Sequence, residues 1–197
     1  MGARALSLSL LLAVPAVLAG SQSFKNMAPE SFTANAQVLS RAGGAASVIG
    51  IQIDRYTADG DHGEIVNALK GGDHAAFLEA LHRAPVVGSV TIGQRSTPIR
   101  WARERREGGS RRIGIVTESP LFFAGAGAAD AKPTAGYDLG VLEFTVDTVG
   151  LGRGTMAGAA KVKAGGPTGI EIDEYSGKKI TLVSVTRKIP DKPTARD

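Results

Sequence analysis

The dominant pattern of this chain is the alternation of apolar and polar residues. It is clearest in residues 142–148, where Leu142, Phe144 and Val146 alternate with polar side chains. A period of two sends successive side chains to opposite faces of a β-strand, so only one set can face a core. We therefore expect a half-buried strand here, with Phe144 buried.

Similar short segments rich in β-branched residues recur along most of the chain. Turn-forming residues separate several of them, as at residues 107–110, which predict the turn of a hairpin. The predicted strands are residues 32–39, 48–56, 86–92, 99–106, 111–117, 142–148, 155–163, 169–175 and 179–188.

One region is helical instead. Asp61 and Glu64 resemble a capping box ahead of an apolar run, and two glycines at residues 71–72 predict the end of that helix. Asp73 is placed to cap a second short helix that ends before Pro85. Neither helix is long enough to be stable alone, so both must pack on a sheet.

These elements predict an α+β domain, mostly an antiparallel β meander with one two-helix insertion. Many consecutive hairpins leave sheet edges that need protection, so the sheet can curl into a partly closed barrel.

The first 19 residues have the pattern of a cleavable signal peptide. Arg4 supplies a positive start, residues 5–19 are nearly all apolar, and the small residues Val17 and Ala19 fit cleavage after Ala19. The apolar run is shorter than the roughly 20 residues of a membrane-spanning helix, and no later run approaches that length. We expect an exported protein, periplasmic or extracellular, without a transmembrane span after cleavage.

The expected organisation follows from these boundaries. Residues 1–19 are the signal peptide, residues 20–31 a flexible leader, residues 32–189 a single α+β domain, and residues 190–197 a disordered tail.

Composition narrows the possible chemistry. The chain has no cysteine, which excludes disulfides, thiol catalysis and thiolate metal sites. The net charge of +4 is modest, so we expect no specific nucleic-acid binding.

Several segments carry a resemblance to known proteins. Residues 53–57 (IDRYT), 111–115 (RRIGI), 156–161 (MAGAAK) and 170–175 (IEIDEY) are similar to a group of small exported bacterial proteins with no assigned activity. The resemblance implies a shared domain and an exported location. It carries no catalytic residue over to this sequence.

Candidate metal sites are incomplete. Glu79 and His82 have the spacing of a Glu-x-x-His metal pair, but a di-metal site needs a second pair and two more carboxylates. A calcium-loop-like start at Asp59 fails at its twelfth position, where Lys70 stands in place of glutamate. We read the histidines as residues of solvated helix faces, and we expect neither a metal nor a cofactor.

No catalytic motif is evident. The Gly-x-Ser-x-Gly elbow of many serine hydrolases is absent. A carboxylate pair for glycoside hydrolysis could be drawn from Glu143, Asp147, Glu171 and Asp173, but alternation places these on polar strand faces. We therefore assign no catalytic residue and favour a non-enzymatic binding or interaction role. The alternative is an envelope hydrolase with a site assembled from scattered polar residues.

Positive charge is densest on the predicted hairpin around residues 107–110. We expect Ile99 and Trp101 to anchor its base, and residues 103–111 to project into solvent. Arginines presented in this way suit anionic envelope polymers or lipid headgroups, although a charged hairpin can also serve only to prevent aggregation. The candidate anion-binding residues are Arg103, Arg105, Arg106, Arg111 and Arg112.

Overall fold

The computed structural model describes residues 28–38, 45–123 and 135–188. Within these ranges the chain forms two helices and nine strands, and all paired strands run antiparallel. The elements are β1 (Glu30–Val38), β2 (Ala45–Ile53), α1 (Asp59–Lys70), α2 (His74–Arg83), β3 (Gly88–Ile92), β4 (Arg95–Glu107), β5 (Ser110–Thr117), β6 (Leu139–Val146), β7 (Leu151–Gly165), β8 (Gly169–Tyr175) and β9 (Ile180–Lys188).

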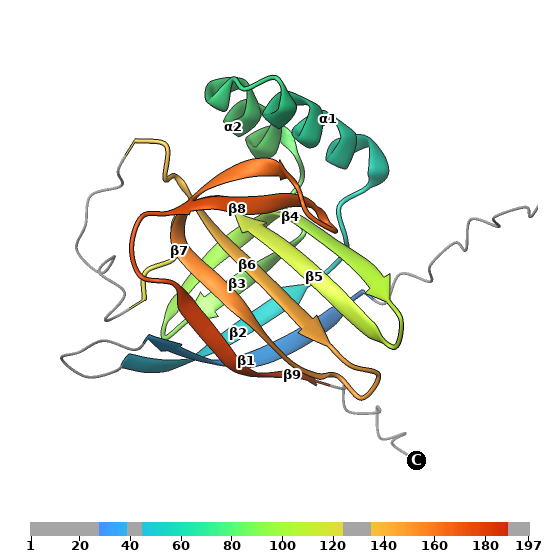
Figure 1. Ribbon diagram of the computed structural model, residues 1–197, viewed down its shortest axis with the longest axis vertical. Helices are drawn as coiled ribbons and strands as arrows, with labels where there is room; N and C mark the ends of the chain where they lie inside the picture. The colour runs from blue at the N-terminus through green and yellow to red at the C-terminus, as the bar shows by residue number, and fades with distance from the viewer. Residues whose placement is uncertain (1–27, 39–44, 124–134, 189–197) are drawn as a thin grey trace, which may run out of the picture.

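Eight of the strands close into a barrel (Figure 1). The sheet runs in the order β6-β5-β4-β3-β2-β1-β9-β7, and a further pairing of β6 with β7 joins its two edges. The α+β class and the antiparallel meander are confirmed, and the barrel is fully closed rather than partly closed. Because the barrel is closed, each of these eight strands pairs with a neighbour on both sides.

The barrel interior holds the main hydrophobic core. Alternate residues of the barrel strands face inward except across bulges, as the period of two predicted. Phe144 is only 2% exposed, which confirms the prediction for β6. Its ring meets that of Phe32 edge to face, with the centroids 5.1 Å apart. Gly152 lies where β7 passes closest to β6, because an added Cβ there would lie 1.8 Å from the carbonyl oxygen of Thr145.

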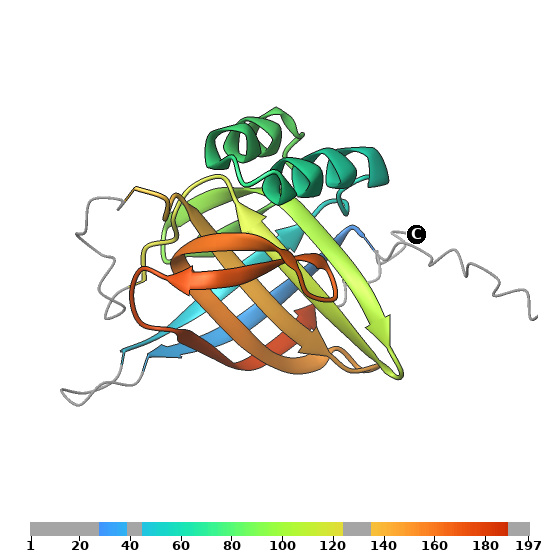
Figure 2. The same cartoon turned by 45° about the horizontal axis from the view of Figure 1, so that its top comes forward.

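A second apolar layer covers one side of the barrel. Helices α1 and α2 and the hairpin of β7 and β8 lie outside the wall formed by β4 to β7 (Figure 2). Ile65 of α1, Phe77 of α2 and Ile170 of β8 are buried there with Trp101. The two short helices are thus stabilised by packing on the sheet, as expected.

The helix boundaries were predicted in part. Asp73 accepts hydrogen bonds from the backbone N–H groups of Ala75 and Ala76, so its capping role is confirmed. The cap predicted at Asp61 is wrong. Helix α1 begins at Asp59, and its first flanking residue, Ala58, makes no side-chain capping bond.

A bulge in β4 changes which residues face the core. The register between β4 and β5 shifts between Ile99 and Trp101, with Arg100 as the extra residue. As a result Ile99 faces the barrel interior and Trp101 faces the outer layer. The two residues expected to anchor the base of the hairpin therefore lie on opposite faces of the strand, because strict alternation fails across a bulge.

The start of the domain also differs from expectation. Strand β1 begins at Glu30, so Glu30 and Ser31 belong to the barrel rather than to a flexible leader. The predicted signal peptide and C-terminal tail lie outside the described residues. Within the described ranges, no helix combines the length and apolarity needed to cross a membrane.

Candidate functional site

A cluster of charged side chains fills one end of the barrel. Its members face inward from β1, β4, β5 and β9, and Tyr56 joins them from the connection between β2 and α1. The cluster, which we call the ion plug, consists of Glu30, Tyr56, Glu104, Arg111 and Arg187.

Arg111 is the centre of the ion plug. Its Nη1 and Nη2 donate to the two carboxylate oxygens of Glu30 at 3.1 and 2.6 Å, and its Nε donates to Glu104 at 2.7 Å. The Nε of Arg187 donates to Glu30 at 2.8 Å, and the hydroxyl of Tyr56 donates to the same carboxylate. Buried charges that are paired and hydrogen-bonded in this way avoid most of the cost of desolvation.

The ion plug shifts the acid–base behaviour of its members. Burial acts to raise the pKa of Glu30, but hydrogen bonds from Arg111 and Tyr56 outweigh it, so the pKa is lowered from 4.5. Burial and the neighbouring Glu30 carboxylate raise the pKa of Tyr56. Glu30 therefore stays ionised and Tyr56 stays protonated across the neutral range.

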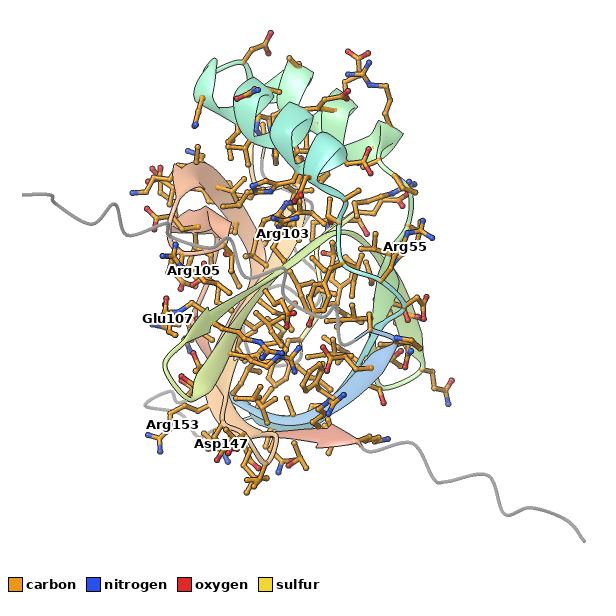
Figure 3. The ribbon with its side chains drawn as sticks, turned by 90° about the vertical axis from the view of Figure 1, so that its right-hand side faces the viewer. Arg55, Arg103, Arg105, Glu107, Asp147 and Arg153 are labelled. Carbon is orange, nitrogen blue, oxygen red and sulfur yellow. The ribbon has the colours of Figure 1, made fainter. Side chains whose placement is uncertain are left out.

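A pocket of about 220 Å³ opens beside the ion plug. It lies between the β4–β5 turn and the β6–β7 turn, close to the end of β9. Its lining residues are Arg106, Gly108, Gly109, Ser110, Arg111, Asp147, Thr148, Gly150 and Arg187. Asp147 lines it together with Gly108 and Gly109 of the β4–β5 turn, and Figure 3 labels Asp147 below that hairpin. We call this cavity the arginine pocket.

The arginine pocket is lined by cationic side chains and by glycines of two turns. Arg106 is exposed on its wall, and Arg187 lines it while donating from Nε to Glu30. The carboxylate of Asp147 also lines the wall, but it accepts the backbone N–H groups of Val149 and Leu151. The arrangement can bind an anionic group through guanidinium groups.

The five predicted arginines do not act as one surface. Arg103 binds Asp59 at 2.8 Å and the carbonyl oxygen of Thr57 at 2.9 Å, which ties β4 to the start of α1 (Figure 3). Arg105 reaches toward the carbonyl oxygen of Pro167 at 3.5 Å. Of the five, Arg106 and Arg111 line the pocket.

Two of the five form ion pairs with glutamates. The terminal nitrogen of Arg112 lies 3.5 Å from a carboxylate oxygen of Glu107. Arg111 is 9% exposed, so the expectation that residues 103–111 all project into solvent is wrong at this end of the hairpin. Arg111 precedes the buried Ile113 and Ile115 at intervals of two residues along β5. It therefore faces inward with them.

Trp101 is buried in the outer layer. It is 1% exposed, and its Nε1–H donates to Nδ1 of His62 at 3.1 Å. Burial lowers the pKa of His62, and the nearby Arg103 lowers it further. The solvated-helix reading is thus wrong for His62, which is a half-buried neutral acceptor in the outer layer.

Of the four candidate carboxylates of a hydrolase, only Asp147 lines the arginine pocket, while Glu143 and Glu171 lie near each other elsewhere. Burial raises the pKa of Glu143, which accepts a hydrogen bond from the backbone of Ile172. Glu171 and Asp173 both pair with Lys163, and Asp147 orders the β6–β7 turn. Glu143 does not line the arginine pocket. The carboxyl group with a raised pKa therefore lies outside this cavity.

The candidate metal ligands are also separated. Residues 59–70 form helix α1, so the predicted calcium-like segment is not a loop. His74 pairs with Asp138 at 2.9 Å, and His82 contacts the carbonyl oxygen of Glu118 at 3.3 Å. In the described ranges, no three His, Asp or Glu side chains lie together as a metal site would require.

Sequence reasoning missed Glu30, Tyr56 and Arg187. A signal for Glu30 exists, because it shares the parity of the inward-facing residues Phe32 and Ala34 that follow it. Comparison with known proteins gives no match to a protein-family model, to a curated protein or to a solved structure.

Proposed function

We propose that this protein is an exported, non-enzymatic binding domain that holds an anionic group of a cell-envelope polymer or lipid headgroup in its arginine pocket. The periplasm or the extracellular space is the proposed location. The proposed ligand contacts are Arg106 and Arg187, with the backbone N–H groups of the β4–β5 turn.

The observation that carries this proposal is the composition of the pocket wall. Three guanidinium groups and several glycines line a cavity of about 220 Å³ beside the ion plug. Glycines let the main chain approach a ligand closely, and Gly108 has a φ of 59° in the turn that forms one wall. The ion plug holds Arg111 and Arg187 in place before any ligand arrives, which lowers the cost of binding.

Binding is favoured over catalysis for a geometric reason. A hydrolytic site needs a titratable group with a shifted pKa at the place where the substrate sits. The carboxyl group with a raised pKa, Glu143, lies away from the pocket. The ionised Glu30 is occupied by three hydrogen-bond donors.

The test compares two neighbouring arginines. Arg106→Ser removes a pocket residue, while Arg105→Ser removes the same charge from the adjacent exposed position that lies outside the pocket. Retention on a heparin column and binding of phosphatidylglycerol vesicles are measured for the mature protein at several salt concentrations. Arg106→Ser should weaken binding roughly tenfold, the loss expected from one charge-assisted hydrogen bond of about 1.5 kcal/mol.

Salt dependence and the control decide the outcome. Wild-type binding should fall steeply with salt, because an anion displaces counterions when it binds. Equal losses in Arg105→Ser and Arg106→Ser would show diffuse charge attraction and contradict a role for the pocket.

Mass spectrometry of protein recovered outside the cytoplasm tests export, since a retained Met1 would contradict cleavage after Ala19.

A further inference from the structure

The barrel wall formed by β9, β1, β2 and β3 lies on the side away from the helices (Figure 1). Alternation identifies its outward positions, since the residues between them face the buried core. We call this surface the neutral face. Its residues are Ser31, Thr33, Asn35, Gln37, Ala46, Val48, Gly50, Gln52, Ser89, Thr91, Thr181, Val183, Ser184 and Thr186.

Among the outward positions of these four strands the only charged residue is Lys188, which lies at the margin of the face opposite Ser31, although charged residues make up 21% of the chain. Asp54, just after β2, accepts a hydrogen bond from Gln52 at the same end. Barrel walls that stay in water normally carry charged side chains, which oppose association between molecules. The absence of charge therefore distinguishes the neutral face from the arginine hairpin.

A shallow hollow of about 320 Å³ lies on the neutral face. It is lined by residues of β1, β2 and β9, including the amide side chains of Asn35 and Gln37. Two apolar side chains stand at this hollow, Val48 with 57% of its surface exposed and Val183 with 45%. The neutral face thus combines exposed apolar groups with neutral hydrogen-bonding groups.

We infer that the neutral face associates with the neutral face of a second copy of this chain. A twofold axis places the same patch on both sides of an interface, so the patch must complement itself. Ser, Thr, Asn and Gln side chains each carry a donor and an acceptor and can pair with their own kind. Two molecules with a net charge of +4 repel each other least where both surfaces lack charge.

The size of the neutral face fits a reversible dimer. A strand spacing of about 4.8 Å and a rise of about 3.3 Å per residue give four strands a projected area of about 500 Å². Projecting side chains enlarge that area toward the roughly 800 Å² per partner of a specific interface. This inference does not depend on the proposed anion site, which lies on different residues.

Analytical ultracentrifugation of the mature protein over a range of concentrations tests the inference. The wild type should shift from monomer to dimer as concentration rises. Asn35→Lys places a charge on an exposed position of the face and should raise the dissociation constant by about tenfold or more, since two lysines then approach each other. Val149→Lys is the control, because Val149 lies on the β6–β7 turn and is 71% exposed. It should leave the dissociation constant nearly unchanged.

Cross-linking supplies an independent readout. The chain has no cysteine, so Asn35→Cys introduces a single thiol. Mild oxidation should give disulfide-linked dimers of Asn35→Cys and far fewer of Val149→Cys. A wild type that remains monomeric at every concentration, or equal cross-linking of the two variants, would overturn the inference. So would an Asn35→Lys variant that dimerises like the wild type.

Discussion

Arg111 of β5 and Glu30 of β1 form a two-point ion pair across the inside of the barrel, although 81 residues separate them in the chain. Both carboxylate oxygens of Glu30 accept from this one guanidinium. The pair connects the first described strand to the arginine hairpin. It also holds Arg111, which lines the arginine pocket.

Glu30→Gln should destabilise the protein by about 3–5 kcal/mol, because it leaves the buried Arg111 and the partly buried Arg187 without their shared carboxylate. Urea unfolding followed by circular dichroism measures the change in free energy. Glu107→Gln is the matched control, since Glu107 pairs with Arg112 on the surface at 3.5 Å. That substitution should change stability by no more than about 0.5 kcal/mol. Similar values for both variants would contradict the structural importance of the ion plug.

The ion plug also predicts a loss of stability in acid. The pKa of Glu30 is lower in the folded state than its ordinary 4.5. The ionised form is therefore favoured by folding, and its contribution is fully present above about pH 4.5. It is lost as the pH falls through the folded pKa. Thermal melting between pH 3 and 7 should show a smaller acid-dependent drop in Glu30→Gln than in the wild type, and equal drops would argue against this assignment.

Glu143 should behave in the opposite sense. Burial raises its pKa above 4.5, so folding favours the protonated form and stability falls as the pH rises through the folded pKa. Glu143→Gln keeps an acceptor for the backbone N–H of Ile172 and removes the buried charge. Its melting temperature at pH 7 should exceed that of the wild type, and the difference should vanish near pH 4. A lower melting temperature at pH 7 would show that the carboxylate is stabilising.

The pair of His62 and Trp101 supplies an optical test of the outer layer. Trp101 is the single tryptophan of the chain, and its indole N–H donates to Nδ1 of His62. Protonation of His62 removes that acceptor, and the pKa of His62 lies below its usual 6.5. Tryptophan fluorescence should therefore titrate with a midpoint below pH 6.5, and stability should decline as the pH falls past that value. His62→Gln should abolish this transition.

Phe144→Ala should destabilise the barrel by about 3–5 kcal/mol, since it removes a buried ring and leaves a cavity beside Phe32. Val149→Ala, at an exposed turn position, should change stability by less than about 0.5 kcal/mol. Chemical denaturation of both variants provides the comparison. A nearly neutral Phe144→Ala would mean that β6 does not face the core as described.

The sequence predicted individual strands better than their arrangement. Local alternation identified β6 and the burial of Phe144, because both depend only on neighbours in the chain. Closure depends on the pairing of β1 with β9 and of β6 with β7, which no local pattern encodes. The bulge at Arg100 is also invisible locally, and it moved Trp101 to the outer layer.

The candidate site was predicted in the same partial way. Clustered arginines drew attention to the right hairpin, but their partners come from distant segments. Glu30 and Arg187 enter the site through the closure of the barrel, and separation of these residues along the chain hides them from motif reasoning. Arg111 and Ile113 are two residues apart in β5, so alternation places them on the same face of the strand. This spacing is the local signal that Arg111 faces inward.

The seam between β1 and β9 sets the order in which the molecule can be made. Strand β9 supplies the partner for both β1 and β7, and it is the last described strand to leave the ribosome. Until it emerges, the barrel cannot close and β1 keeps one unpaired edge. Contacts this distant in the chain form slowly, so a nascent molecule stays open throughout synthesis. The barrel therefore acquires its continuous sheet only after the most C-terminal described strand has been made.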